Sequence, residues 1–518
     1  MNKKILWVDD EIDFFRAHIE FLKTKGYYVT GVTNGDDGVE LFKNESFDMV
    51  LLDEMMIGMD GLETLTQIRN IDIHVPIVMI TKNEGEELMQ SAIAQRITDF
   101  LTKPVNPSQI LSVFLKIFSA KEIQQRKTIE NLNRDFIRIR ERLQNVSSPT
   151  EWIDMYKELL RLENQYDFVK DKGLDSVFNS LKEEINNRYA VFIKNNYPQL
   201  LLNNDNVLFS HQFIPKVIFP LIKNGKRVFF FLLDCMRADQ WLSMSSVIKD
   251  DFNINTQYYY SILPTATPYS RNAIFSGKLP LTLQQSYPNL IPWFKETESG
   301  KNDNEYDLLL KLMDEYGIYL KGRPYFTKIL DASWAGEVHE KMSSLKKLHF
   351  VTFVFNFLDI IIHHRANSKV LQEIVFDENS FKRIARDWFE NSWIYRIIQK
   401  VAQIPDAVIV LTTDHGSILC NKPVVIKGDS KISYSLRFKI GNYLKIDERH
   451  GWLVKEPSEL FLPKSGVLTN YAFSYNNNYF AFTGNVGQFS EKYNNNFFHG
   501  GISLEEMILP YAIITPKK

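Results

Sequence analysis

Short apolar runs alternate with amphipathic segments over the first 118 or so residues of the chain. The runs predict five strands, at Lys4–Val8, Tyr28–Val32, Met49–Leu52, Ile77–Ile80 and Phe100–Leu101. The segments between them carry helical periodicity. Strands that alternate with helices predict an α/β fold built on a doubly wound parallel sheet.

The pattern changes to helix between Lys121 and about Tyr197. One apolar seam keeps the 3-4-3-4-3 spacing of a helix face and comprises Ile129, Leu132, Phe136, Ile139, Leu143 and Val146. Two further helical stretches, Thr150–Lys170 and Asp175–Asn195, complete a predicted three-helix module. The seam requires a partner surface, which is either the neighbouring helices or a second chain in a dimeric coiled coil. The sequence leaves both alternatives open, because about three heptads are short for a coiled coil.

The β-α alternation returns after Val207 and continues to the end of the chain. Its strongest strand candidates are Arg227–Leu233, Leu348–Phe357 and Ala407–Thr413. These strands predict a second α/β domain. We therefore predict three parts for the 518-residue chain: residues 1–120, a helical connector of residues 121–205, and an α/β effector domain of residues 206–518.

The composition excludes some classes of protein and favours one compartment. A formal net charge of -2 with 24% charged residues gives no overall basic field that would attract nucleic acid. The first ten residues contain an acidic pair where a signal peptide would have its apolar segment, and the chain has no apolar run long enough to span a membrane. Its two cysteines suit a reducing compartment. We expect a soluble cytoplasmic protein without membrane insertion.

Acidic residues follow two of the predicted N-terminal strands. Asp9 and Asp10 end the first strand and Asp53 ends the third, so three carboxylates meet at the carboxyl edge of the sheet. Such a cluster repels itself unless a hard cation joins it, and Mg²⁺ prefers oxygen ligands of this kind. Thr81 and Lys103 follow the fourth and fifth strands and supply a hydroxyl and an ammonium for phosphoryl oxygens.

These residues, in this order and spacing, resemble the CheY-like receiver family over residues 3 to about 118. The resemblance implies that Asp53 is the phosphoacceptor, that Asp9 and Asp10 bind magnesium with it, and that Thr81, Lys103 and the aromatic Phe100 form the switch. The proline that usually follows the phosphoacceptor is absent here. Its absence alters the loop after Asp53 but not the chemistry.

The second α/β domain carries acids and histidines at comparable positions. Asp234 ends a strand, Asp414 and His415 end another, and His499 lies near the C-terminus. Asp359 and His363 are four residues apart, which places them on one face of a helix where both can hold one ion. Oxygen and imidazole ligands suit zinc, with manganese as the weaker alternative. Two metals could stabilise both the attacking and the leaving oxygen of a phosphoryl displacement.

A nucleophile is expected in the segment Pro264–Gly277, which has the pattern of a loop that enters a helix. Thr267 would lie at the helix start, where free N–H groups and the helix dipole favour negative charge. A metal on its hydroxyl would generate the alkoxide.

The order of these motifs resembles the alkaline-phosphatase superfamily, including its nucleotide pyrophosphatase/phosphodiesterase branch. The resemblance covers about residues 207–518 and implies an alkaline-phosphatase-like α/β domain with two metal sites. One metal would take Asp359, His363 and His499, and the other would take Asp234, Thr267, Asp414 and His415.

Thr265 is the rival nucleophile. Thr267 is preferred because its ten-residue distance to Gly277 matches the phosphodiesterase branch. The asparagine expected three residues after the nucleophile is replaced by Ser270. Arg271 and Asn272 are therefore the candidates for holding the substrate phosphoryl oxygens.

A receiver, a helical-bundle connector and a domain that ends in His499-Gly-Gly-Ile-Ser-Leu-Glu-Glu-Met resemble the PorX response regulators of Bacteroidota, which carry a PglZ domain. The resemblance implies a sensor histidine kinase of the PorY type as partner, control of type IX secretion, and phosphodiesterase action on cyclic or linear oligonucleotides. Phosphorylation of Asp53 is expected to drive homodimerisation in which the helical module takes part.

Two other functions are compatible with the sequence. In the first, the hydrolase fold is a non-enzymatic platform that binds a sigma factor or a secretion-motor subunit. A decayed site usually loses some ligands, whereas all of them are present here, which favours catalysis. In the second, the same metal core serves a phosphotransferase or mutase, which would need a substrate-specific cap. Monoester and diester substrates would separate these classes.

Overall fold

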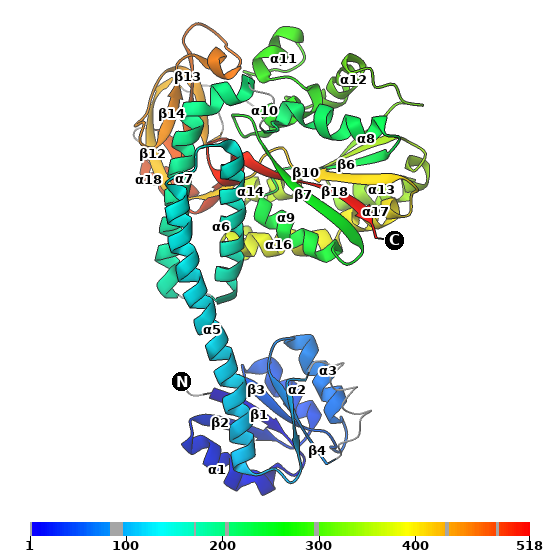
Figure 1. Ribbon diagram of the computed structural model, residues 1–518, viewed down its shortest axis with the longest axis vertical. Coiled ribbons are helices and arrows are strands. Elements are labelled where there is room, and N and C mark those ends of the chain that lie inside the picture. Colours follow the sequence, from blue (N-terminus) through cyan, green and yellow to red (C-terminus); the bar gives the residue numbers. More distant parts are fainter. Residues whose placement is uncertain are drawn as a thin grey trace. The chain divides into compact units, whose positions relative to one another are not determined.

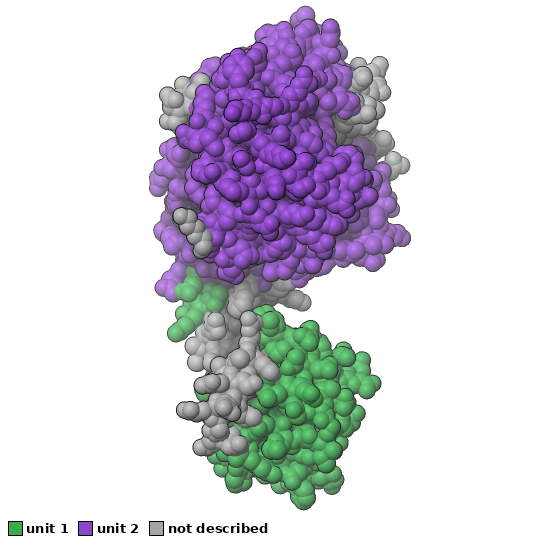
Figure 2. Space-filling model, turned by 90° about the vertical axis from the view of Figure 1, so that its right-hand side faces the viewer, with its two compact units in different colours: residues 1–131 green, residues 132–518 purple. Residues whose placement is uncertain are grey.

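The computed structural model describes residues 3–82, 97–169, 172–202, 207–294, 300–429, 435–482 and 486–517. The chain forms two compact units, residues 1–131 and residues 132–518 (Figure 2). Within the described parts, no helix is long and apolar enough to cross a membrane.

Unit 1 is built on a parallel sheet with the strand order β2-β1-β3-β4-β5 (Figure 1). Its strands are β1 (Lys3–Val8), β2 (Tyr27–Val32), β3 (Met49–Asp53), β4 (Ile77–Thr81) and β5 (Asp99–Thr102). Its helices include α1 (Arg16–Thr24), α2 (Gly35–Asn44) and α3 (Gly61–Ile71). All five predicted strands are confirmed, and the sheet is buried on both faces as its near-continuous apolar runs require.

Three long helices follow: α5 (Pro107–Leu143), α6 (Pro149–Val169) and α7 (Lys172–Leu202). From Leu132 onward, α5 belongs to unit 2. The predicted seam is confirmed over Leu132, Phe136, Ile139 and Leu143, which are buried together with residues of α6 and α7. This part of the seam therefore has its partner within the chain rather than in a second copy.

The apolar core of these helices is continuous with that of the following α/β domain. Tyr197 of α7 shows the connection, since its hydroxyl accepts a hydrogen bond of 2.7 Å from the Leu263 N–H. The helical connector and the α/β domain consequently form one compact unit, residues 132–518.

The α/β domain has a central sheet with the order β7-β18-β10-β6-β9-β8. Its strands are β6 (Arg227–Leu233), β7 (Phe252–Tyr260), β8 (Tyr325–Ile329), β9 (Phe350–Phe355), β10 (Ala407–Thr412) and β18 (Ile508–Pro516). β8, β9, β6 and β10 are parallel, whereas β18 is antiparallel to its neighbours. The aromatic run of β6 explains its central position, because alternate residues enter two different cores, Val228, Phe230 and Leu232 in one and Phe229, Phe231 and Leu233 in the other.

The α/β domain contains further helices and two smaller sheets. The helices are α8 (Phe219–Lys223), α9 (Ala238–Ile248), α10 (Thr267–Ser276), α11 (Pro280–Ser286), α12 (Glu305–Glu315), α13 (Ala332–Leu345), α14 (Phe357–Arg365), α15 (Lys369–Ile374), α16 (Glu378–Asn391), α17 (Trp393–Ala402), α18 (Val486–Tyr493) and α19 (Leu504–Met507). A second sheet, ordered β14-β15-β13-β12-β16, contains β12 (Lys422–Asp429), β13 (Phe438–Lys445), β14 (Gly451–Val454), β15 (Thr469–Ser474) and β16 (Asn478–Phe482). A two-stranded sheet joins β11 (Ile418–Cys420) to β17 (Asn496–Phe498).

Candidate functional site

Three carboxylates of the α/β domain lie at the carboxyl edge of adjacent parallel strands. Asp234 follows β6 and Asp414 comes two residues after β10, its partner strand. Asp359 lies in the first turn of α14, which begins just after β9. In open α/β sheets ligands bind at this edge, and the strand order β10-β6-β9 brings all three acids to one place.

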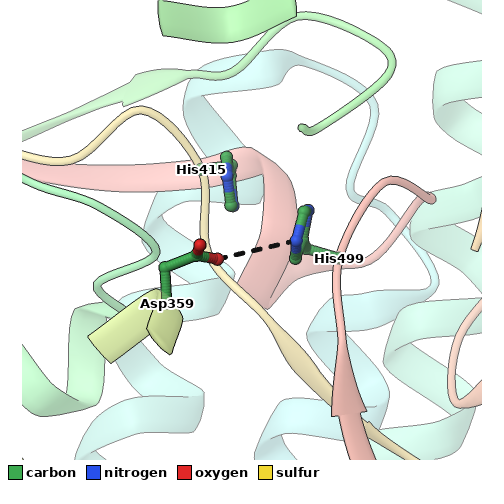
Figure 3. A group of neighbouring side chains, drawn as sticks. All are labelled: Asp359, His415 and His499. Carbon is green, nitrogen blue, oxygen red and sulfur yellow. Dashed lines mark ion pairs between the residues drawn. The ribbon is translucent and has the colours of Figure 1, made fainter. Parts of the chain in front are cut away.

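The first group of predicted metal ligands consists of Asp359, His363 and His499. His363 Nε2 lies 3.3 Å from Asp359 Oδ1 and 3.3 Å from His499 Nε2. The His499 Nε2–Asp359 Oδ1 distance is 3.7 Å, marked by the dashed line in Figure 3. The predicted Asp-x-x-x-His pair is thus on one helix face and meets a histidine more than 130 residues further along the chain.

The second group consists of Asp234, Thr267, Asp414 and His415. His415 Nε2 lies 2.9 Å from Thr267 Oγ1, 3.5 Å from an Asp234 oxygen and 3.9 Å from an Asp414 oxygen. The Thr267 hydroxyl also lies 3.3 Å from Asp234 Oδ1. Thr267 begins α10 and is only partly buried, so the structure places a reachable hydroxyl among these ligands.

His415 connects the two groups. Its ring stacks on that of His499 with 4.2 Å between centroids (Figure 3). Its ligand atoms lie within 4.8 Å of those of Asp359 and His499, and also of those of Asp234 and Asp414. The sequence assigned His415 to one set only, because spacing along the chain does not show which loops become neighbours.

The donor set fits divalent cations. Among the described residues, Asp359 Oδ1 and Asp414 Oδ2 are buried without a hydrogen-bond partner. A buried carboxylate oxygen is costly unless a proton or a cation compensates it. Burial raises the pKa of Asp414 to about 7, with Asp234 adding to the effect, and burial likewise raises the pKa of Asp234 to about 7 against the opposing charge of Arg271. A divalent cation bound here would compensate these buried carboxylates.

Thr265, the rival nucleophile, has a different environment. Its hydroxyl is fully buried, donates to the Gly501 carbonyl at 2.9 Å and accepts from the Gly500 N–H at 3.0 Å. The Thr265 carbonyl also lies 3.2 Å from His499 Nδ1. Thr265 therefore holds the loop that carries His499, and the geometry favours Thr267 as the reactive hydroxyl.

Arg271 is buried and bound to protein carboxylates. Its Nη1 lies 2.7 Å from Asp234 Oδ2 and its Nε lies 2.6 Å from Glu305 Oε1. Glu305 is fully buried and also 3.1 Å from Lys328 Nζ. Sequence analysis missed Glu305, since an acid at the start of an exposed-looking helix carries no signal of burial.

Asn272 does not match its predicted role in binding substrate. Both of its amide hydrogens are donated to main-chain carbonyls, those of Pro268 and Lys301, each at 2.8 Å. Its side chain is fully buried, so it has no donor left for a phosphoryl oxygen. The structure gives Asn272 the role of joining α10 to the segment before α12.

The acidic cluster of unit 1 forms as predicted. Ligand atoms of Asp9, Asp10 and Asp53 lie within 4.8 Å of one another. Lys103 Nζ lies 2.9 Å from Asp53 Oδ2 and 3.1 Å from Asp9 Oδ2. Burial raises the pKa of Asp53 to about 6, against the opposing hydrogen bond from Lys103. The cluster therefore places three carboxylates around one ammonium.

Thr81 and Phe100, two of the three predicted switch residues, lie on neighbouring strands. Thr81 ends β4, and its hydroxyl donates to the Glu54 carboxylate next to Asp53. Phe100 lies on β5 and packs, partly buried, against the core beneath β4.

Three segments of the chain match known families. Residues 5–114 match the "Response regulator receiver domain" and residues 122–201 match the "PorX response regulator linker domain". Residues 213–514, more than half of the chain, match the "BREX system PglZ alkaline phosphatase-like domain". Receiver and alkaline phosphatase-like domains generally use metal ions, in agreement with the three clusters of ligands.

Individual relatives match the N-terminal unit. The chemotaxis protein CheY of Thermotoga maritima is 33% identical over 119 residues, which are 23% of this chain and 98% of that protein. The alkaline phosphatase synthesis transcriptional regulatory protein PhoP of Bacillus subtilis is 31% identical over 24% of this chain and 51% of its own length. The solved chemotaxis protein CheY4 of Vibrio cholerae shares 28% identity over 22% of this chain and 98% of its own, with a TM-score of 0.22. The chain spans about half the length of the Bacillus relative and less of several other curated relatives.

Proposed function

This chain belongs to the PorX-type response regulators, which join a receiver and a PorX linker to a PglZ alkaline phosphatase-like domain, and from this premise we propose that its effector is a zinc-dependent phosphodiesterase. The observation that carries the proposal is the Thr267 hydroxyl, which lies 2.9 Å from His415 Nε2 and 3.3 Å from Asp234 Oδ1 at the start of α10. The proposed substrates are cyclic or linear oligonucleotides, by resemblance to the family.

The residues present would hold two zinc ions. Asp359, His363 and His499 would bind one, and Asp234, Thr267, Asp414 and His415 would bind the other. When bound, the ions would lower the pKa of the nucleophilic hydroxyl and stabilise charge on the attacking and leaving oxygens. Arg271 would position Asp234, since its Nη1 lies 2.7 Å from that carboxylate, rather than contact the substrate directly.

The side chains suggest a two-step displacement. The Thr267 Oγ attacks phosphorus and the bond from phosphorus to the leaving oxygen breaks. The proton lost by the Thr267 hydroxyl is matched by the proton that the leaving oxygen takes up to depart as an alcohol. Water then attacks phosphorus, and breaking of the phosphorus–Oγ bond releases the phosphate monoester and regenerates Thr267.

Metal binding should depend on pH. In the metal-free protein the raised pKa values of Asp234 and Asp414, each about 7, mean that both take protons as the pH falls below 7. Zinc must displace those protons, so its affinity should fall by about 100-fold between pH 8 and pH 6. Equilibrium dialysis with zinc at the two pH values measures this change. An affinity that is the same at both would mean that these carboxylates are not ligands.

The receiver would control this site. A histidine kinase is the partner that a receiver implies, and we place one of the PorY type upstream. Asp53 would accept the phosphoryl group with magnesium held by Asp9, Asp10 and Asp53 itself, and Thr81, Lys103 and Phe100 would respond to it. Phosphorylation would promote homodimerisation in the cytoplasm, and the output would be regulation of type IX secretion.

Substrate class tests the proposed activity. Zinc-loaded protein should hydrolyse bis(p-nitrophenyl) phosphate faster than p-nitrophenyl phosphate, and a chelator should remove both activities. Preference for the monoester would indicate a phosphatase. Bound zinc without hydrolysis of either ester, or of a short oligonucleotide, would favour the non-enzymatic platform for a sigma factor or secretion-motor subunit.

A further inference from the structure

The short helix α19 contacts both loops that carry the clustered histidines. The Gly501 N–H, next but one to His499, donates to Glu506 Oε1 at 2.9 Å. On the other side, the Gly416 N–H, next to His415, donates to the Glu506 carbonyl. A Cβ atom at Gly416 would lie only 1.9 Å from the Glu505 carbonyl oxygen, so backbone packs directly on backbone. A displacement of α19 therefore displaces His415 and His499 together.

Helix α7 of the connector holds α19 through Asn186. The Asn186 Oδ1 accepts a hydrogen bond of 2.8 Å from the Leu504 N–H, in the first turn of α19. Its Nδ2 lies 3.2 Å and 3.4 Å from the two carboxylate oxygens of Glu505. Asn186 is fully buried and Glu505 is 3% exposed, so water does not compete for these bonds. The contact joins residues that are 318 positions apart.

Lys182, one helical turn before Asn186, adds charge to the same contact. Its Nζ lies 3.3 Å from Glu505 Oε1, 2.6 Å from Glu378 Oε2 and 3.7 Å from Glu163 Oε1. Glu163 belongs to α6 and Glu378 to α16, so one ammonium joins four helices. Buried charges are stable only when their partners keep their geometry, which makes this cluster a specific attachment rather than a generic apolar contact.

We propose that α7 sets the relative position of the two histidine loops, with Asn186 and Lys182 as positioning residues of the effector site. This inference rests on the proposed function in treating His415 and His499 as metal ligands. The connector is then part of the support of the site, and a shift of α7 along or away from α19 changes the ligand geometry. The bonds that tie Thr265 to Gly500 and Gly501 give the His499 loop a second attachment.

The substitution Asn186→Leu tests the proposal, since leucine is similar in size but cannot accept from the Leu504 N–H. In the zinc-free protein, amide hydrogen exchange over residues 499–507 and 413–418 should become at least about tenfold faster. Zinc affinity should fall by about 10- to 100-fold, as is usual when a residue that orients a ligand is lost. The matched control is Asn179→Leu, at an exposed position two turns earlier on the same helix, and it should change neither quantity.

Exchange and zinc affinity that equal the wild-type values in Asn186→Leu would overturn the proposal. Should that variant not fold, Asn186→Ser gives the same test. Serine is too short to reach Glu505, and it places a polar rather than an apolar side chain in the core. The exchange measurement needs no metal and no substrate. If the protein proved not to be a zinc phosphodiesterase, the coupling of α7 to the two loops would still be decided.

Discussion

Thr267→Ala should lower kcat for diester hydrolysis by a factor of at least about 10³ while the protein keeps its zinc. The physical reason is that the hydroxyl supplies the atom that attacks phosphorus, whereas the other proposed ligands of the same ion, Asp234, Asp414 and His415, remain in place. The measurement pairs steady-state kinetics on bis(p-nitrophenyl) phosphate with the zinc content of the same samples. Rapid quenching of wild type should also trap a p-nitrophenyl phosphoryl group on Thr267.

Thr265→Val is the comparison that separates the two threonines. It keeps the shape of the side chain but removes the hydroxyl that bonds to Gly500 and Gly501. We expect weaker zinc binding, with activity restored at high zinc concentration, because Thr265 supports the His499 loop. Full activity in Thr267→Ala, together with irreversible loss in Thr265→Val, would instead make Thr265 the nucleophile.

Asp53→Asn should abolish stable phosphorylation of the receiver by a small phosphoryl donor. The carboxylate oxygen that would form the bond to phosphorus is lost, while the amide keeps the size of the side chain beside Lys103. Phosphate-affinity electrophoresis measures the loss. Light scattering with and without the donor should show a phosphorylation-dependent dimer in wild type and none in the variant.

Asp60→Asn is the matched control in the same loop. Asp60 is the N-cap of α3 and accepts a hydrogen bond from the Glu63 N–H, a role that asparagine performs equally well. This variant should be phosphorylated at the wild-type rate. Phosphate retained in Asp53→Asn would mean that another acid of the cluster is the acceptor, and a donor-induced dimer in that variant would separate dimerisation from phosphorylation.

Strand positions and the acids that follow them could be read from the sequence. The run Arg227–Leu233 predicts β6 residue for residue, and the Asp359-x-x-x-His363 spacing predicts the helix face that α14 presents. Both signals are local, because the periods of two residues in a strand and 3.6 in a helix are properties of the backbone. The ends of parallel strands share one edge, so the acids at those ends could also be expected to meet.

The sequence could not distinguish residues that contact substrate from residues that support others. Arg271 and Asn272 follow the predicted nucleophile and carry suitable donors. In the structure, Arg271 is paired with Asp234 and Glu305, and the amide of Asn272 is bonded to main-chain carbonyls. Which donors remain free depends on partners from α12 and the segment before it, and spacing along the chain contains no such information.

By itself, then, the sequence determined the order of the two α/β domains and the connector, the strand-end acids, and the chemistry that carboxylates and imidazoles can support. Only the tertiary structure decided that His415 lies between both ligand groups, that Thr265 holds a loop while Thr267 faces the ligands, and that Asn186 of the connector holds α19. The reason is physical: backbone periodicity is encoded by neighbouring residues, whereas contacts across hundreds of residues follow from strand order and from how the buried polar groups find their partners.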